Sequence, residues 1–229
     1  MIGYGTNIVR NGLVLHLDAA NPKSYPGSGT SWYDLSGDNR HATLTNGPTY
    51  NSNNNGSILF DGIDDYAVVD ANVYYAYQKE ITVSCWLLFN SFNYILSQAV
   101  KNSDTMANNV WLWHAATNGF SWYVNNNGSW VATSISSLST GVWYFITTVA
   151  NSSNLFIYKN NELAVNTPSG VSTQILNSPN SQIATNDHRY ATSRPPHYGK
   201  ISTIQIYNRA LSSAEIAQNF EATRGRYSI

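Results

Sequence analysis

Apolar and polar side chains alternate most regularly between Glu80 and Asn90, in the sequence EITVSCWLLFN. The odd positions from Ile81 to Phe89 are all apolar, and the stretch contains no Gly or Pro. A period of two places these side chains on one face of a β-strand, where they face a core. Because Trp86 and Leu88 make the opposite face partly apolar as well, the pattern predicts a central strand in one sheet that packs on a second sheet.

Shorter runs of the same kind predict further strands along the chain. They lie at Leu13–Asp18, His41–Thr45, Ser57–Phe60, Asp65–Asp70, Tyr94–Gln98, Val110–Ala115, Gly119–Val124, Trp130–Thr133, Val142–Ala150, Leu155–Tyr158, Glu162–Asn166, Gln182–Ala184 and Lys200–Asn208. Residues that favour turns separate these runs. The pair Asn160-Asn161 suits a two-residue hairpin, and Asn118 suits a backbone conformation with positive φ.

One helix is expected, near the C-terminus. Ser212 and Glu215 have the spacing of a capping box, Ile216 and Phe220 share one face, and the helix is expected to end near Gly225. Many short strands followed by one late helix predict an all-β fold, an antiparallel two-sheet sandwich. Residues 13–229 are expected to form one domain, and residues 1–12 an arm that lies on this domain or on a neighbour.

Composition narrows the classes of partner. Charged residues make up 11% of the chain and the formal net charge is −1, so a nucleic-acid partner has no electrostatic basis. No apolar run approaches the length of a membrane span, and the N-terminus lacks the pattern of a signal peptide, so we expect synthesis in a cytoplasm and no membrane partner. The single cysteine, Cys85, lies on the apolar face of the central strand and is expected to be a buried, inert side chain.

Several segments, in this order, resemble one family. They are Gly12–Ala19 (GLVLHLDA), Trp32–Gly37 (WYDLSG), Phe60–Tyr66 (FDGIDDY), Trp143-Tyr144 and Ile204–Ser212 (IQIYNRALS), and they look like the laminin-G-like, concanavalin A-like lectin/glucanase domains. The resemblance covers nearly the whole chain and implies a two-sheet antiparallel jelly roll. The opening through Asn21–Gly27 and the ending Phe220–Tyr227 further resemble stand-alone versions found among tailed-bacteriophage virion proteins. Since members of the family include sugar binders, protein binders, glycan-cleaving enzymes and structural virion parts, function has to be argued from the residues.

Glycan hydrolysis is disfavoured by the carboxylates. It normally requires two carboxylates that flank the scissile bond, and glucanases that resemble this chain carry them at alternate positions of one strand. The chain contains only four glutamates, at positions 80, 162, 215 and 221, and none has that spacing. We therefore expect no enzymatic activity, and a glycoside hydrolase is the remote alternative.

A calcium site is a second candidate. Asp61, Asp64 and Asp65 supply hard oxygen ligands in a tight loop before a strand. Some similar domains hold calcium between this loop and acidic residues of the last strand, but the corresponding segment here, Ile201–Ile204, has no carboxylate. The alternative is an Asp-rich turn whose side chains bind backbone amides, and this alternative is favoured.

Aromatic side chains form the third candidate site. Trp and Tyr rings stack on the apolar faces of sugars, and neighbouring amide groups bind hydroxyls. The candidates are Trp111, Trp113, Trp122, Trp130, Tyr190 and Tyr198. For each of these residues the alternative is a place in the sandwich core.

Low charge and many Tyr and Asn residues are also typical of permanent protein–protein contacts. The arm of residues 1–12 and the tail of residues 224–229 could reach a neighbouring subunit. Together with the resemblance to tailed-bacteriophage virion proteins, this composition favours a non-enzymatic virion surface protein, either a capsid decoration or a fibre component. Its partners would be other virion proteins or further copies of itself, with a host glycan as an additional ligand. The main alternative is a soluble, lectin-like carbohydrate-binding module without a virion role.

Overall fold

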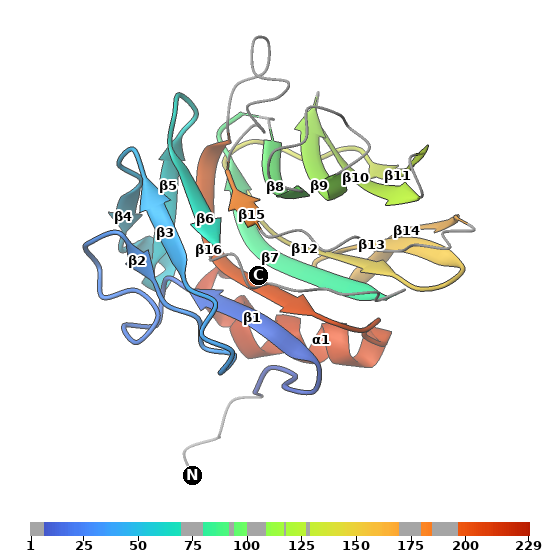
Figure 1. The fold of residues 1–229 in the computed structure, drawn as a ribbon, viewed down its shortest axis with the longest axis horizontal. Coiled ribbons are helices and arrows are strands. Elements are labelled where there is room, and N and C mark those ends of the chain that lie inside the picture. The colour runs from blue at the N-terminus through green and yellow to red at the C-terminus, as the bar shows by residue number, and fades with distance from the viewer. Residues whose placement is uncertain are drawn as a thin grey trace.

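A computed structural model describes residues 7–69, 80–91, 94–99, 109–116, 118–126, 129–169, 180–184 and 197–229. Two antiparallel sheets face each other, and one helix lies on the outside of the first sheet (Figure 1). This arrangement confirms the predicted all-β jelly-roll sandwich with one short C-terminal helix. Within the described ranges, the single α-helix is too short to cross a membrane.

The first sheet, called sheet A, contains the central strand predicted from the sequence. In spatial order its strands are β14 (Glu162–Pro168), β13 (Asn154–Lys159), β12 (Trp143–Ala150), β7 (Ile81–Phe89), β16 (Tyr198–Tyr207), β5 (Ser57–Asp61) and β4 (Thr49–Asn51), and β1 (Leu13–Asp18) pairs with β16. Strand β16 pairs with β5 through residues 198–201 and with β1 through residues 203–207. Its register shifts against β7 between Ile201 and Thr203, close to the point where one partner gives way to the other.

The second sheet, called sheet B, lies across the core from sheet A. Its strands, in spatial order, are β11 (Ser129–Ile135), β10 (Gly119–Asn126), β9 (Asn109–Ala116), β8 (Tyr94–Ala99), β15 (Asn180–Ile183), β6 (Tyr66–Val69), β3 (Ala42–Thr45) and β2 (Ser31–Trp32). Strands β11 in sheet B and β14 in sheet A are therefore both edge strands. They lie near each other, and the hydroxyl oxygens of Thr133 and Thr167 are hydrogen-bonded at 2.7 Å.

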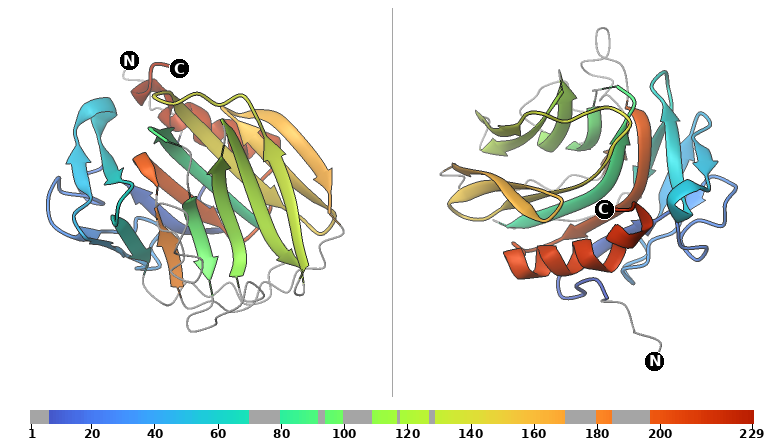
Figure 2. Two further views of the ribbon diagram at one scale, coloured as in Figure 1. Left: turned by 90° about the horizontal axis from the view of Figure 1, so that it is seen from above. Right: turned by 180° about the vertical axis from the view of Figure 1, so that it is seen from behind.

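Both faces of β7 are buried. Ile81, Val83, Cys85, Leu87 and Phe89 point into the core between the sheets, as their alternation predicts. The opposite face of sheet A is covered by helix α1 (Ser213–Thr223), which runs along it on the outside of the sandwich (Figure 2). A strand covered on both sides loses the contrast between apolar and polar positions, which explains the tryptophan at position 86.

The helix begins as the sequence predicts. Ser212 accepts a hydrogen bond from the Glu215 backbone, and Glu215 accepts one from the Ser212 backbone, so the capping box is complete. Ile216 and Phe220 are buried against sheet A. Arg209 donates two hydrogen bonds to the same Glu215 carboxylate and ties the helix start to the end of β16.

The chain beyond α1 folds back on its own domain. A short 3-10 helix, η4 (Arg224–Arg226), leads to Tyr227, which is 5% exposed. Arg226 forms a two-fold hydrogen-bonded ion pair with Asp18 at 2.8 and 3.0 Å. The side chain of Tyr227 is thus part of this molecule's own core, while Ile229 at the end of the tail is 40% exposed, and contact of the tail with a neighbouring subunit stays a prediction.

Residues 7–12 also lie on the domain. The Val9 backbone donates to the Asn219 side chain and accepts from the Tyr207 hydroxyl, and Val9 is buried beside α1. Of the two alternatives for the N-terminal arm, these six residues follow the one in which the arm packs on its own domain.

The strand bounds agree with the predicted runs to within about two residues, but two short strands were missed. Strands β2 and β4 contain two and three residues, too few for a periodic pattern. The Asn160-Asn161 turn has φ values of 51° and 70°, which confirms the predicted hairpin, and Asn118 has φ 56°.

Candidate functional site

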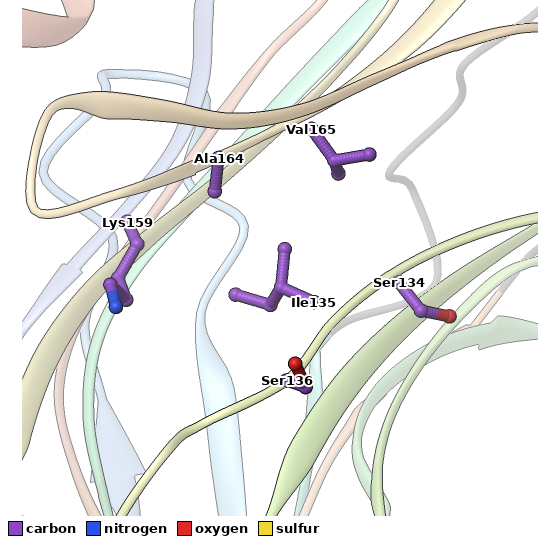
Figure 3. A pocket seen from close by; sticks show the side chains of 6 residues that line it. All are labelled: Ser134, Ile135, Ser136, Lys159, Ala164 and Val165. Carbon is purple, nitrogen blue, oxygen red and sulfur yellow. The ribbon is translucent and has the colours of Figure 1, made fainter.

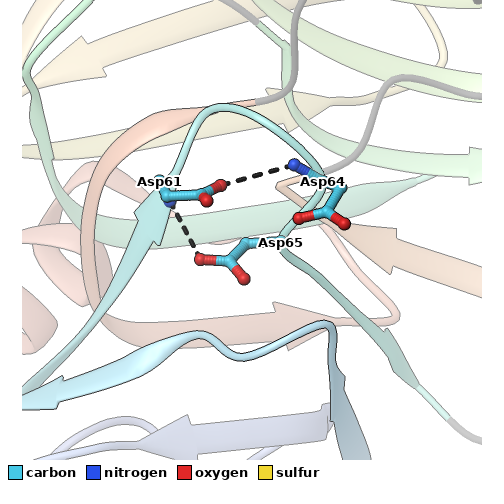
Figure 4. Close-up of side chains that lie close together, drawn as sticks. All are labelled: Asp61, Asp64 and Asp65. Carbon is cyan, nitrogen blue, oxygen red and sulfur yellow. Dashed lines mark hydrogen bonds between the residues drawn. The ribbon is translucent and has the colours of Figure 1, made fainter.

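The acidic turn between β5 and β6 is held by its own backbone (Figure 4). Ligand atoms of Asp61, Asp64 and Asp65 lie within 4.8 Å of one another. The Asp61 carboxylate accepts hydrogen bonds from the Ile63 and Asp64 amides at 2.8 and 3.3 Å, and the Asp65 carboxylate accepts one from the Asp61 amide at 3.0 Å. These bonds are those of the Asp-rich turn that the sequence analysis favours over a metal site.

Burial supports the same interpretation. Asp65 is 4% exposed, and removal from water is the main cause that raises the pKa of its carboxyl group. Calcium normally has six to eight oxygen ligands. Ile201–Ile204 contributes no carboxylate, so these side chains alone would leave most of that coordination sphere to backbone and water. Calcium binding at Asp61, Asp64 and Asp65 stays a prediction.

Two of the aromatic candidates lie in the core. Trp113 and Trp122 are 0% exposed, and the Trp113 indole donates a 3.0 Å hydrogen bond to Thr148 on the facing sheet. A sugar cannot reach either ring, so the expectation that they bind glycan is corrected. The physical reason is that strands β9 and β10 turn these positions toward sheet A. For Trp111 the structure describes only the backbone, which pairs with Val124 on β10, and Tyr190 lies outside the described residues.

Two other aromatic candidates reach the surface. Trp130 is partly exposed on β11 and meets Tyr123 of β10 edge-to-face, with ring centroids 6.4 Å apart. Tyr198 is 43% exposed at the start of β16, where it pairs with Asp61. Trp130 and Tyr198 belong to different sheets. The structure therefore gathers Trp130 with Tyr123, and places Tyr198 at the acidic turn.

The outer face of sheet B continues along β11 from Trp130. Successive side chains of a strand alternate between its faces, so Trp130, Ala132 and Ser134 share the outward one. The inward positions Val131 and Ile135 pack on the core instead. Ser134 shares a 2.8 Å hydrogen bond with Ser121 on β10. At roughly 3.3 Å per residue, Ser134 lies about 13 Å from Trp130 along the strand.

A groove opens where β11 approaches the β13–β14 hairpin (Figure 3). It has a volume of about 300 Å³ and is lined by Ser134, Ile135, Ser136, Lys159, Ala164 and Val165. The side chain of Ile135 projects from β11 into the space between β11 and the β13–β14 hairpin. Lys159 lies on the hairpin side of this space. The lining thus combines hydroxyl groups, apolar side chains and one cation. This composition suits a site that binds a small polar ligand.

Sequence reasoning did not identify this groove. Its residues come from two edge strands of different sheets, and the proximity of those edges is a tertiary property. The only sequence signal is that Ser134 and Ser136 occupy alternate positions just beyond the predicted strand Trp130–Thr133.

The four glutamates do not form a catalytic pair. Glu215 is held by Arg209 and by the helix cap, and the hydrogen bonds from Arg209 are the main cause that lowers its pKa to about 2. Glu221 pairs with Arg224, and Glu80 accepts from the Ala210 amide. Glu162 is exposed on β14. They are spread over a helix, a loop and an edge strand, so they lack the two-sided geometry of glycan hydrolysis.

Two buried histidines have no visible chemistry. His16 is 7% exposed and His197 is 0% exposed, and burial lowers their pKa values to about 4 and about 3. His197 lies between the rings of Phe60 and Phe89 in the core. Both are therefore neutral at pH 7, as core residues.

A family model described as the concanavalin A-like lectin/glucanases superfamily matches residues 60–217. No curated protein sequence matches this chain. Among solved structures, the chain is similar to the ligand binding domain of botulinum neurotoxin serotype D in complex with N-acetylneuraminic acid (TM-score 0.72, 16% identity, 93% of this chain and 51% of that chain). It is also similar to the binding domain of botulinum neurotoxin DC in complex with rat synaptotagmin II (TM-score 0.74, 18% identity, 94% of this chain and 52% of that chain).

A third similar structure is the binding domain of Paraclostridial Mosquitocidal Protein 1 (TM-score 0.70, 18% identity, 92% of this chain and 52% of that chain). At these identities the likeness shows the fold alone. The chain spans about half the length of the solved structures that it matches.

Proposed function

This chain belongs to the concanavalin A-like lectin/glucanases superfamily, and we propose that it is a non-enzymatic binding domain that recognises glycan on a host surface. The single observation that carries the proposal is the strip along edge strand β11. It combines a surface aromatic pair, Tyr123 and Trp130, with the hydroxyl-lined groove at its other end. Rings that stack on sugars beside groups that bind hydroxyls are the usual elements of carbohydrate recognition.

The placement of the carboxylates supports a binding role over hydrolysis. None of the six residues that line the groove is acidic, and three of the four glutamates have structural partners. The solved structures that share the fold are described as binding domains, with N-acetylneuraminic acid in one complex and a protein receptor in another. That description applies to those proteins, of which this chain spans about half.

A glycan array with the full chain tests the proposal. We expect the wild-type protein to retain a subset of glycans and Trp130→Ala to lose that retention. The two proteins should have similar melting temperatures. Absence of binding to every glycan, or binding that survives both Tyr123→Ala and Trp130→Ala, would contradict the proposal for this strip.

We propose further that the domain is displayed on the surface of a tailed-bacteriophage virion, as a capsid decoration or fibre component made in the host cytoplasm. The low share of charged residues supports permanent contacts with other virion proteins or with further copies of the chain. Since Tyr227 and residues 7–12 pack on their own domain, such contacts would use the folded surface, including the exposed end of the tail.

The alternative is a soluble carbohydrate-binding module without a virion role, and a glycoside hydrolase is the remote one. Mass spectrometry of purified particles separates the first two. The virion proposal predicts peptides of this chain at constant stoichiometry after repeated purification. Their loss during purification would favour the soluble module.

A further inference from the structure

We infer that the groove between β11 and the β13–β14 hairpin binds the carboxylate of an acidic sugar, with Lys159 as its counter-ion. This inference rests on the proposed glycan-binding function and specifies the class of ligand for the same strip. Lys159 is the only charged residue among the six that line the groove. A groove of about 300 Å³ is at the small end of ligand sites, so it suits a single sugar ring rather than a longer chain.

The strand register places Lys159 at the mouth of the groove. On β13, Leu155 and Ile157 are fully buried in the core, and Lys159 follows them at the next alternate position. Lys159 is partly exposed and lines the groove, which fits a long side chain whose apolar stem is covered and whose amine reaches solvent. No ion pair joins Lys159 to a carboxylate in the part of the chain that the structure describes. An acidic ligand would supply the Lys159 ammonium group with a counter-ion.

The nearest acidic residue on the same hairpin is Glu162, which pairs with Lys159 in the ladder between β13 and β14. Glu162 is exposed and lies at the start of the edge strand. Glu162 does not line the groove, but as the residue opposite Lys159 it would compete with an anionic ligand for the ammonium group.

The rest of the lining fits a sugar ring better than a bare anion. Ile135 and Val165 offer apolar surface on which the C–H face of a pyranose can lie, while the Ser136 hydroxyl can donate to and accept from ring hydroxyls. A neighbouring sugar would extend along the outward face of β11 toward Trp130, about 13 Å from Ser134 at roughly 3.3 Å per residue. A chain with one acidic sugar and one or two neutral sugars therefore matches the strip.

Calorimetric titration of the full chain with sialyllactose, its methyl ester and lactose tests the inference. The methyl ester keeps the shape of the sugar and removes its charge. We expect the ester and lactose to bind about tenfold or more weakly than sialyllactose, since a charge-assisted hydrogen bond is lost. An oligogalacturonate and its methyl ester form a second matched pair.

Protein variants test the residue. Lys159→Met keeps the apolar stem and should lower the affinity for sialyllactose about tenfold, Lys159→Arg should retain it, and Glu162→Gln should raise it. If Lys159→Met does not fold, the comparison of acid and ester on the wild-type chain still decides the question. Equal affinity for acid and ester, or displacement of sialyllactose by an equal concentration of inorganic phosphate, would overturn the inference.

The outcomes separate the two proposals. Binding of neutral glycans with no preference for acidic ones would overturn the inference about Lys159 and leave the glycan-binding function standing. Binding of no glycan of either kind would overturn both. Binding of sialyllactose could also be lost in Trp130→Ala but unchanged in Lys159→Met. The glycan-binding function would then stand, but the carboxylate of the sugar would not bind at Lys159, which also overturns the inference.

Discussion

The ring of Tyr227 lies on the ring of Trp86, with centroids 3.9 Å apart and planes at 20°. Trp86 comes from the middle of β7, and Tyr227 comes from the chain beyond the last helix. The Tyr227 hydroxyl donates a 2.7 Å hydrogen bond to Ser202 on β16, and burial raises its pKa. The C-terminal segment therefore closes the outer face of sheet A at its centre.

Removal of the Tyr227 ring should destabilise the whole domain. Tyr227→Ala exposes Trp86, opens a cavity and leaves the Ser202 hydroxyl without this partner, so we expect a loss of about 3 kcal/mol in the free energy of unfolding. Ile229→Ala is the control, since Ile229 is 40% exposed and should change stability by less than about 0.5 kcal/mol. Urea denaturation measures both, and a loss below about 1 kcal/mol for Tyr227→Ala would contradict this account of the tail.

The ion pair between Asp18 and Arg226 predicts a second effect at the same place. The Asp18 side chain is 5% exposed, so Arg226→Ala leaves a buried carboxylate without its partner and should cost about 3 kcal/mol. The double variant Asp18→Asn with Arg226→Met removes both charges and should be more stable than Arg226→Ala alone. If the double variant is the less stable of the two in urea denaturation, the charge of Asp18 is not the cause of the loss.

Stability should fall in mildly acidic solution because of the buried histidines. His16 has its pKa lowered to about 4, whereas in the unfolded chain it is about 6.5, so below pH 6.5 the unfolded state binds a proton that the folded state does not. The stability contributed by neutral His16 is complete above about pH 6.5 and is lost as the pH falls toward 4, by about 1.4 kcal/mol per pH unit. His197 adds a second group of the same sign.

His16→Gln isolates the contribution of His16. Its unfolding free energy should depend less on pH between 6.5 and 4, by about 1.4 kcal/mol per pH unit relative to the wild-type chain. Urea denaturation at several pH values measures the slope. Identical slopes for the two proteins would show that His16 is not held neutral by burial.

Trp122 and Trp130 should respond differently to the same substitution. Trp122 is fully buried, and Trp122→Ala should cost about 4 kcal/mol of stability. Trp130 is partly exposed, so Trp130→Ala should cost less than about 1 kcal/mol and act on glycan retention instead. Thermal unfolding together with a glycan array distinguishes the two. A large loss of stability in Trp130→Ala would mean that its ring has a structural role.

The β13–β14 hairpin requires residues that tolerate positive φ. The Asn160 side chain also accepts a hydrogen bond from the Phe145 amide, whereas the Asn161 side chain makes no hydrogen bond to the described residues. Asn161→Gly should therefore be neutral or stabilising by a few tenths of a kcal/mol, and Asn161→Val should cost about 1–2 kcal/mol. Similar melting temperatures for the two variants would contradict the turn assignment.

The sequence was sufficient for the elements whose causes are local. The alternation around Cys85, the paired asparagines at 160 and 161, and the Ser212–Glu215 cap each act through neighbours in the chain, and the structure confirms all three. The place of the tail could not be read in the same way. Tyr227 meets Trp86 across 141 positions of the chain, and no local pattern encodes such a contact.

The binding strip was only partly predictable for the same reason. An alternating Trp has the same local pattern whether its face meets the other sheet or the solvent, so Trp122 and Trp130 could be separated only by the structure. The groove depends on two edge strands from different sheets. Lys159 lines a groove only because the fold brings these strands together.

The most direct test of the central claim is to incubate the full chain with a glycan that it retains on the array, and to measure bound glycan and newly released reducing ends in the same sample. The account predicts saturable binding with no increase in reducing ends over the protein-free control. Accumulation of reducing ends in proportion to the amount of protein would contradict it, because the domain would then be an enzyme.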